Sequence, residues 1–273
     1  MAKSETYVQN YFFNSVVAKP MYHYSDYLIE TMRIINNQIP LINLHIKRLL
    51  ISMPHLKLPT DSIVAIQEYI NFEIRKEKIE TAIGRLTISR NKCNVSSEQS
   101  GLSSINFNLS IKKTLKIQNK MCDIDLTAFV FPQNNIYLNY KTGNRQLYNL
   151  ATLSKINVNS FQSLLLDSKE YIIDCENYGI YWIIDNNVYT SSLISGSLLS
   201  VSKMAIDKIL TNNSMDLQYV YTHYSCLYKA QAVFLANAVN GVIPVSTFGM
   251  CHYSTNHPLI ELCATQLNNL YVS

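Results

Sequence analysis

One lysine stands in a setting that suits chemistry, within the stretch YLNYKTGNRQLYNLA at positions 137–151. Apolar and aromatic residues precede Lys141, and the short polar segment TGNR follows it. A lysine amine becomes a nucleophile and a base when burial and nearby cations lower its pKa, because the neutral form then exists near neutral pH. The pattern predicts either such an amine or an ordinary surface lysine at a turn between a strand and a helix.

Other chemistries find little support in the sequence. The six histidines lack metal-ligand spacing, and no HExxH motif occurs, so we expect no metal site. The seven glycines form neither GxGxxG nor a P-loop, so a nucleotide held by a glycine-rich loop is not expected. The six cysteines contain no CxxC pair and are interpreted as reduced thiols of a cytoplasmic protein.

The composition is that of a globular chain. Of its 273 residues 48% are apolar and 15% are charged, which allows a sizeable core. The net charge of +4 is small and its basic residues are scattered, so no nucleic-acid partner is expected. The apolar runs are too short to cross a bilayer, and the N-terminal segment has no apolar stretch typical of a signal peptide, so no membrane partner is expected.

The elements that must position Lys141 follow from hydrophobic periodicity. In the first part, apolar residues at helical spacing predict helices over 43–53 and 59–78, the second capped by Thr60 or Asp61. Alternating residues then predict strands over 84–89 and 105–112, joined by a polar hairpin loop.

A second region begins near residue 120 and is also mixed α and β. Helices are predicted over 202–211 and 258–272. Asp185, Asn186 and Asn187 predict a hairpin turn. Strands are predicted over 126–131, 163–167, 170–174, 179–184, 187–191, 217–221, 232–236 and 242–248.

Five sequence blocks follow one another along the chain: YLIETMRIINNQIPLINLHIKRL, KTGNRQLYNLA, LLLDSKEYIIDCENYGIYWIIDNNVYTS, GSLLSVSK and LYKAQAVFLANAVNGVIPV. In this order they together resemble the class IV (fold-type IV) pyridoxal-phosphate enzymes. That group holds branched-chain and D-amino-acid aminotransferases and aminodeoxychorismate lyase. The resemblance implies a mixed α/β fold with a small N-terminal domain, 1–117, a larger C-terminal domain, 118–273, and pyridoxal 5'-phosphate between them. It also implies a homodimer acting on a small-molecule substrate.

The resemblance also implies roles for individual residues. Lys141 carries the cofactor as an aldimine and moves a proton on the substrate. Asp174 is the partner of the ring nitrogen, and Leu199 packs against the ring. The cofactor phosphate is bound by Arg48, by the helix start at Val201 and Ser202, including the Ser202 hydroxyl, and by the loop at Asn237 and Ala238. Asn144 and Arg145 are candidates for substrate binding, whereas His45 has a structural role. Each of these residues also has a purely structural interpretation, such as a helix cap for Ser202 or a core side chain for Leu199.

Several positions depart from the family pattern. The ring-nitrogen partner is Asp174 where the family has glutamate, and Glu176 nearby is expected to point elsewhere. Gly179 replaces an asparagine, Lys203 replaces an arginine, and Ser191, Ser200 and Gln231-Ala232 are further replacements. These changes keep open a second class of function, a non-catalytic binding protein on the same scaffold.

The reaction is predicted from two motifs and one loop. KxxNR, which contains Asn144 and Arg145, and NAVNGVIPV both favour aminodeoxychorismate lyase, which forms 4-aminobenzoate and pyruvate for folate synthesis. The loop NKCNVSSEQSG lacks the glycine-rich, arginine-bearing sequence frequent in lyases and favours a branched-chain or D-amino-acid aminotransferase. We expect the lyase, with the aminotransferase as the alternative.

Overall fold

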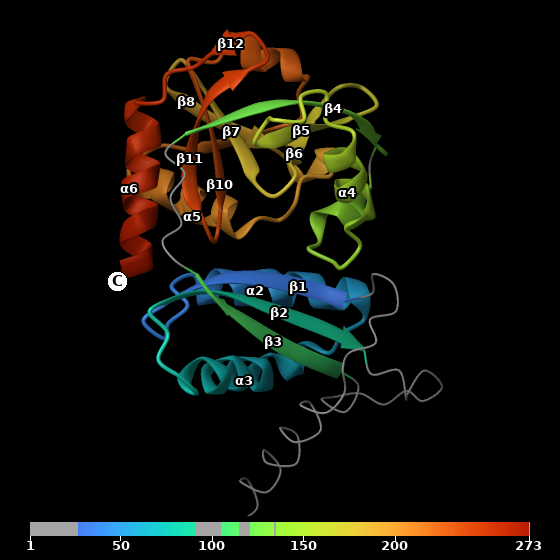
Figure 1. Cartoon of the computed structure of the whole chain (residues 1–273), viewed down its shortest axis with the longest axis vertical. Helices are drawn as coiled ribbons and strands as arrows, with labels where there is room; N and C mark the ends of the chain where they lie inside the picture. Colours follow the sequence, from blue (N-terminus) through green and yellow to red (C-terminus); the bar gives the residue numbers. More distant parts are fainter. Residues whose placement is uncertain (1–26, 91–104, 115–120, 134, 273) are drawn as a thin grey trace, which may run out of the picture.

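The computed structural model describes residues 27–90, 105–114, 121–133 and 135–272, which form two packed units (Figure 1). The predicted mixed α/β fold is confirmed. Four sequence-based expectations concern residues outside the described ranges: the N-terminal segment, the hairpin loop at 91–104, Cys93 and the domain boundary at 117.

The N-terminal unit is an antiparallel sheet with helices packed against it. Its described strands are β1 (Tyr27–Ile35), β2 (Thr81–Arg90) and β3 (Ile105–Lys113), in the order β1-β2-β3. The helices are α2 (Ile42–Ser52) and α3 (Ile63–Arg75), and 3-10 turns η1 (Met53–Leu56) and η2 (Thr60–Ser62) lie between them. Alternate strand residues and one stripe of α3 form a single core, which includes Met32, Ile34, Ile66, Ile70, Leu86 and Ile88.

Two details of this unit differ from the sequence-based expectation. The predicted cap of the second helix is wrong, because residues 60–62 form a 3-10 turn and Ser62 occupies the N-cap of α3 without a side-chain cap bond. The Ser62 hydroxyl instead donates to the carbonyl of Pro59. In addition, Tyr27–Ile35 forms a strand that periodicity did not identify, because several consecutive residues of β1 are buried and the alternation is incomplete.

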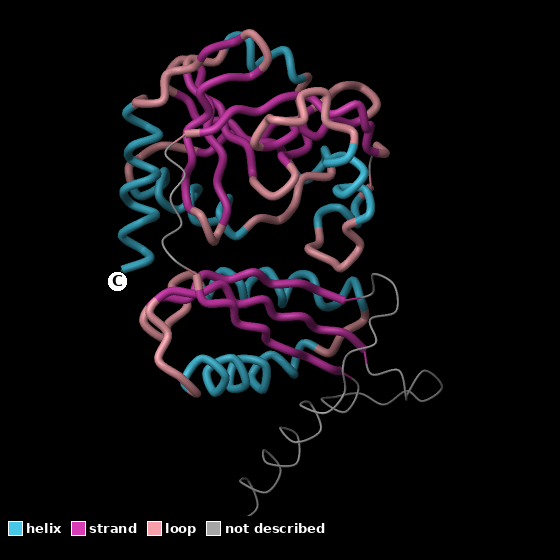
Figure 2. The backbone as a smooth tube through the Cα atoms, in the orientation of Figure 1, coloured by secondary structure: helices cyan, strands magenta, loops and turns pink. Residues whose placement is uncertain are grey.

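The C-terminal unit is built on a larger, mixed sheet, which curls in Figure 2. Within the described residues it has nine strands in the order β6-β5-β4-β11-β10-β7-β8-β9, with β12 paired to β11. The β4–β5, β4–β11 and β8–β9 pairs are parallel, and the other pairs are antiparallel. The strands are β4 (Cys122–Phe131), β5 (Gln162–Asp167), β6 (Ile172–Cys175), β7 (Gly179–Ile184), β8 (Asn187–Ser191), β9 (Leu217–Val220), β10 (Ala232–Asn237), β11 (Gly241–Phe248) and β12 (Cys251–His252).

The predicted hairpin between β7 and β8 is confirmed. Asp185 and Asn186 have φ values of 49° and 61°, which fits a tight turn with two left-handed residues. Asparagine and aspartate tolerate this conformation better than other non-glycine residues.

Helices cover the C-terminal unit and join it to the N-terminal one. They are α4 (Gln146–Leu153), α5 (Val201–Asn212) and α6 (Pro258–Val272), and none of the described helices is both long and apolar enough to cross a membrane. Leu41, at the start of α2, is buried in one cluster with Val201 and Ala205 of α5 and with Leu267 and Tyr271 of α6. This apolar contact holds the two units against each other beside the start of α5.

Candidate functional site

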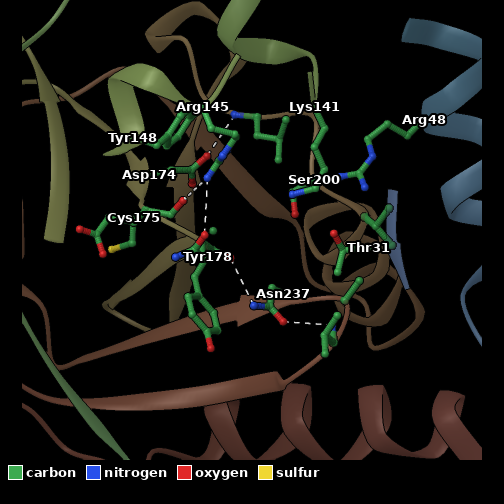
Figure 3. Close-up of a pocket in the computed structure, with 17 residues that line it drawn as sticks. Thr31, Arg48, Lys141, Arg145, Tyr148, Asp174, Cys175, Tyr178, Ser200 and Asn237 are labelled. Atoms are coloured by element: carbon green, nitrogen blue, oxygen red, sulfur yellow. Dashed lines mark hydrogen bonds between the residues drawn. The ribbon is translucent and has the colours of Figure 1, made fainter. Parts of the chain in front are cut away.

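A cavity of about 170 Å³ lies where the two units meet (Figure 3). Thr31 and Arg48 line it from the N-terminal unit, and the remaining lining residues come from the C-terminal unit. These are Lys141, Arg145, Tyr148, Asp174, Cys175, Glu176, Asn177, Tyr178, Gly179, Leu198, Ser200, Val201, Asn237, Ala238 and Val239. The cavity therefore gathers residues from all five sequence blocks. The first block belongs to the N-terminal unit and the other four belong to the C-terminal unit.

The loop that carries Lys141 is held against β1. It follows the 3-10 turn η5 (Ile136–Asn139) and precedes α4. The Lys141 carbonyl accepts from the Ile29 amide at 2.7 Å, and the Gly143 amide donates to the Tyr27 carbonyl at 2.8 Å. A Cβ atom at Gly143 would lie 2.1 Å from the Tyr27 ring, so only glycine fits under that ring. The N-terminal unit thus fixes the position of Lys141.

Lys141 has the electrostatic setting expected of a reactive amine. Burial lowers its pKa most, and the charges of Arg48 and Arg145 lower it further, to about 7. Its Nζ makes no hydrogen bond or ion pair with any described residue, and its side chain lines the cavity. With a pKa near neutral pH, a large share of this cavity-facing amine is neutral there.

Arg48 lies in a buried ion-pair cluster. Its Nε donates to Glu30 at 2.7 Å, Nη2 also bonds Glu30, and His45 Nδ1 lies 2.5 Å from the same carboxylate. Burial opposes ionisation of Glu30, but the Arg48 charge and the His45 hydrogen bond outweigh it and lower its pKa to about 2. The third guanidinium nitrogen, Arg48 Nη1, does not bond Glu30 and lies 3.3 Å from the Leu199 carbonyl. Glu30 and His45 therefore hold the guanidinium at the cavity wall, which gives His45 the structural place expected of it.

The start of α5 forms another wall. Ser200 is the N-cap residue and Val201 the first helical residue, and both line the cavity. The amide groups of the first helical turn have no acceptor within the helix, and the positive end of the helix dipole lies there, so this wall suits an anion.

The hydroxyl expected at this wall comes from a different serine. Ser202 is fully buried, and its hydroxyl donates to the Ala236 carbonyl at 3.0 Å. Because that bond uses the only hydroxyl hydrogen of Ser202, the Ser200 hydroxyl donates in their 2.7 Å contact. Ser200, not Ser202, lines the cavity, since the side chain of the second helical residue turns toward β10.

The leucine at the cavity also differs from the expected one. Leu198 lines the cavity and Leu199 does not, although both line a second hollow of about 330 Å³ together with Met204 and Tyr219. Neighbouring residues of an extended segment point in different directions, so a shift of one position takes the side chain out of the cavity wall.

Asp174 and Glu176 both line the cavity but have different partners. Asp174 Oδ2 accepts from the Ser197 hydroxyl at 2.8 Å and from the Leu198 amide at 3.1 Å, and Oδ1 lies 3.0 Å from Lys203 Nζ. Glu176 Oε2 lies 3.6 Å from Lys155. Both carboxylates are buried and line the cavity.

The loop after β10 closes the lower wall in Figure 3. Asn237 and Ala238 both line the cavity. The Asn237 side chain donates to the Asn177 carbonyl at 3.2 Å and accepts from the amides of Val239 and Asn240. The asparagine therefore shapes the loop, and Ala238 brings the loop backbone close to the cavity.

Of the two candidate substrate residues, the structure brings only Arg145 to the site. Asn144 is exposed. The Arg145 guanidinium lies 3.7 Å from the centre of the Tyr148 ring, and Nη2 donates to the Glu176 carbonyl at 2.9 Å. Arg145 and Tyr148 also line a polar hollow of about 410 Å³ that contains Arg85. This hollow adjoins the cavity through shared walls.

Sequence reasoning missed Thr31, Arg85, Tyr148, Leu198 and Ser200. Thr31 and Arg85 lie on strands far from Lys141 in the chain, and only the packing of the two units brings them near. The sequence offered a signal for Tyr148, because it lies on the amphipathic run shortly after Lys141 that became α4.

The family model for class IV aminotransferases matches residues 27–248. A search of curated protein sequences returned no match. Among solved structures, a Legionella pneumophila protein proposed to be a 4-amino-4-deoxychorismate lyase is similar, with a TM-score of 0.81 and 19% identity over 90% of this chain and 91% of that one.

Two further structures show the same fold. The 4-amino-4-deoxychorismate lyase from Pseudomonas aeruginosa has a TM-score of 0.77 and 17% identity over 89% of this chain and 90% of that one. The branched-chain amino acid aminotransferase from Escherichia coli has a TM-score of 0.76 and 18% identity over 92% of this chain and 86% of that one. Lyase and aminotransferase therefore match this fold about equally well.

Proposed function

This chain belongs to the class IV aminotransferase family, and we propose that it is a pyridoxal 5'-phosphate-dependent enzyme acting on the amino group of an amino-acid-like substrate. The finer proposal is that it is a 4-amino-4-deoxychorismate lyase. The observation that carries the enzyme proposal is Lys141, a cavity-facing amine with a pKa of about 7 and without a partner among the described residues.

The cavity fits the cofactor in charge and in donor set. Arg48 Nη1 and the amides at the start of α5 would hold the phosphate, with the Ser200 hydroxyl beside them. Asp174 would face the ring nitrogen and Leu198 the ring. The bound cofactor supplies an electron sink for negative charge on the substrate carbon.

Lys141 is the residue that holds the cofactor and moves the proton. Its neutral amine would hold the cofactor and, when free, would take a proton from the carbon that bears the substrate amine. A base is most effective when its pKa lies near the working pH. Burial and the charges of Arg48 and Arg145 bring Lys141 into that range.

The substrate side is positive. Arg85 and Arg145 both line the polar hollow that adjoins the cavity, which favours a substrate with carboxylates. Such a substrate agrees with 4-amino-4-deoxychorismate, and the Asn237-Ala238 pair in the cavity wall belongs to the motif that favoured the lyase. An aminotransferase remains the second candidate, because the Escherichia coli aminotransferase has nearly the same TM-score as the lyase structures.

A labelling experiment and a product assay test these proposals separately. Borohydride reduction of the cofactor-loaded protein, followed by peptide mapping, should place the pyridoxyl group on Lys141, and Lys141→Ala should lose it. A label on another lysine, or none, contradicts the site. The purified protein is then given 4-amino-4-deoxychorismate, and separately L- and D-amino acids with 2-oxoglutarate or pyruvate. Formation of 4-aminobenzoate and pyruvate supports the lyase, and amino transfer alone supports the alternative.

We also propose a cytoplasmic homodimer. Apolar side chains are exposed on η5 and on the 3-10 turn η6 (Leu193–Ser195), which contact each other: Ile136, Tyr137, Leu193 and Ile194. Exposed apolar groups of this kind favour burial against a second copy. The free cysteines at the described positions agree with a reducing compartment. Light scattering of the wild type and of Ile194→Glu tests the dimer, since a monomeric wild type contradicts it.

A further inference from the structure

A second buried lysine lies behind the cavity. Lys203 of α5 is 2% exposed, and its Nζ lies 3.0 Å from Asp174 Oδ1. The same nitrogen lies 2.9 Å from the Ser191 hydroxyl and 3.2 Å from the Ser191 carbonyl, and it also bonds the Ser197 hydroxyl. Every polar partner of Lys203 is itself buried.

The hydrogen bonds around Lys203 define its charge. Ser197 gives its hydroxyl hydrogen to Asp174 Oδ2, and Ser191 gives its own to the Ile173 carbonyl. Both hydroxyls can therefore only accept from Lys203. The nitrogen faces four acceptors and no donor, so the cluster is complete only when Lys203 is an ammonium and Asp174 a carboxylate. Burial lowers the pKa of Lys203 as it does that of Lys141, but Asp174 opposes the shift at Lys203, whereas Lys141 faces a cavity and two arginines.

Gly179 makes room for the lysine. A Cβ atom at Gly179, the first residue of β7, would lie 3.3 Å from Lys203 Cε and 3.3 Å from the Tyr181 hydroxyl. The aliphatic part of the Lys203 side chain therefore packs directly on the backbone of Gly179, where no side chain intervenes. The residues at three departures from the family pattern are neighbours in space, because Lys203 lies beside both Asp174 and Gly179. This indicates one coordinated replacement instead of three separate losses of family residues.

Asp174 keeps a single place for another donor. Its Oδ2 already accepts two hydrogen bonds, whereas Oδ1 is buried and forms an ion pair with Lys203 but no hydrogen bond with a described residue. Asp174 lines the cavity and a carboxylate oxygen can accept two hydrogen bonds, so the carboxylate can still accept a donor from a group bound there. A donor placed there shares its proton with Oδ1, and the proton lies on whichever atom is the stronger base.

We propose that Lys203 is a positioning residue that orients Asp174 and supplies the opposite charge beside it, so that a proton shared with the cofactor would stay on the ring nitrogen. This inference rests on the proposed function. An adjacent ammonium favours the charged form of a carboxylate. Without the ammonium, that support is lost and the shared proton would move toward Oδ1.

The ion pair is tested first in the cofactor-free protein. Lys203→Met and Asp174→Asn each leave one buried charge without its partner, and each should lower Tm by about 5 °C or more. The double variant removes both charges and should recover most of that loss. Lys208→Met, on the exposed face of α5, is the matched control and should change Tm little. Additive losses in the double variant would overturn the pairing.

The effect on the ring nitrogen is tested with cofactor labelled at that nitrogen and observed by nitrogen NMR. In the wild type the signal should lie at the position of a protonated pyridine nitrogen. In Lys203→Met it should move toward the unprotonated position. Gly179→Ala pushes the lysine without removing its charge and should move the signal the same way by a smaller amount. A purely structural Lys203 predicts an unchanged signal in any variant that folds, and that result would overturn the inference.

The two experiments separate failure of this inference from failure of the proposed function. A wild type that gives no bound-cofactor signal contradicts the proposed function, while the Tm cycle still reports on the ion pair. A wild type with a bound signal that Lys203→Met leaves unchanged contradicts only the role of Lys203. Lys203→Arg should restore the protonated position wherever it folds, because it restores the positive charge.

Discussion

The substitution Lys141→Met should stabilise the cofactor-free protein at neutral pH. Methionine is close to lysine in length and needs no charge, whereas Lys141 must either stay protonated in a buried site beside Arg48 and Arg145 or give up its proton. In the unfolded chain the amine regains its ordinary affinity for the proton. The unfolded state therefore binds more protons than the folded state, and this favours unfolding below the ordinary lysine pKa.

The magnitude follows from the pKa values. The pKa of Lys141 falls from 10.5 to about 7, and each pKa unit corresponds to about 1.36 kcal/mol. At pH 7 the cost to folding has an upper limit of about 4 kcal/mol, and at pH 10 it falls below about 1 kcal/mol, since the unfolded amine also loses its proton there. The free energy of unfolding should rise from pH 7 to pH 10 in the wild type by this mechanism, and Lys141→Met should remove that part of the rise.

The assay is thermal unfolding of the cofactor-free proteins at several pH values. Lys141→Met should have the higher Tm at pH 7, by several degrees for a chain of this size, and the difference should shrink toward pH 10. Lys169→Met, at an exposed lysine, is the control and should show no such pH-dependent gain. A Lys141→Met protein less stable than the wild type at pH 7, or a gain independent of pH, would refute the reasoning from burial and neighbouring charge.

Three further outcomes are expected. Arg48→Gln should weaken cofactor binding about 10-fold or more in a fluorescence titration, because a charge-assisted contact is lost; unchanged affinity would remove Arg48 from the phosphate site. Gly143→Ala should lower Tm and cofactor affinity together, since its Cβ meets the Tyr27 ring at 2.1 Å, and the added change Tyr27→Ala should recover part of both; no recovery would show that the clash is not the cause. Asp174→Ala should leave the cofactor attached, by its visible absorbance, but slow turnover far more than it weakens affinity; unchanged turnover would make Glu176 the candidate partner of the ring nitrogen.

The sequence by itself determined most of the element types and singled out Lys141 as the lysine for which we propose chemistry. Period-two alternation over 105–112 and helical spacing over 63–74 each match an observed element, because one face of each element packs against a single core. The order of five blocks identified the family, and the family match confirms it. Arg48, Asp174, Val201, Asn237 and Ala238, all predicted from these blocks, line one cavity with Lys141.

Only the tertiary structure decided which side chains face that cavity and what charge they carry. Leu198 and Leu199, and likewise Ser200 and Ser202, differ only in the direction that a backbone turn gives them. The pKa of Lys141 depends on burial and on Arg48, which belongs to the other unit and is brought near by the packing of the two units. Lys203 is one more lysine of a helix in the sequence; in the fold, four converging acceptors and the bare backbone of Gly179 make it a buried ammonium. The charge and direction of these side chains are set by neighbours that are distant in the chain. Hydrophobic periodicity depends only on residues close in the chain, so it cannot predict them.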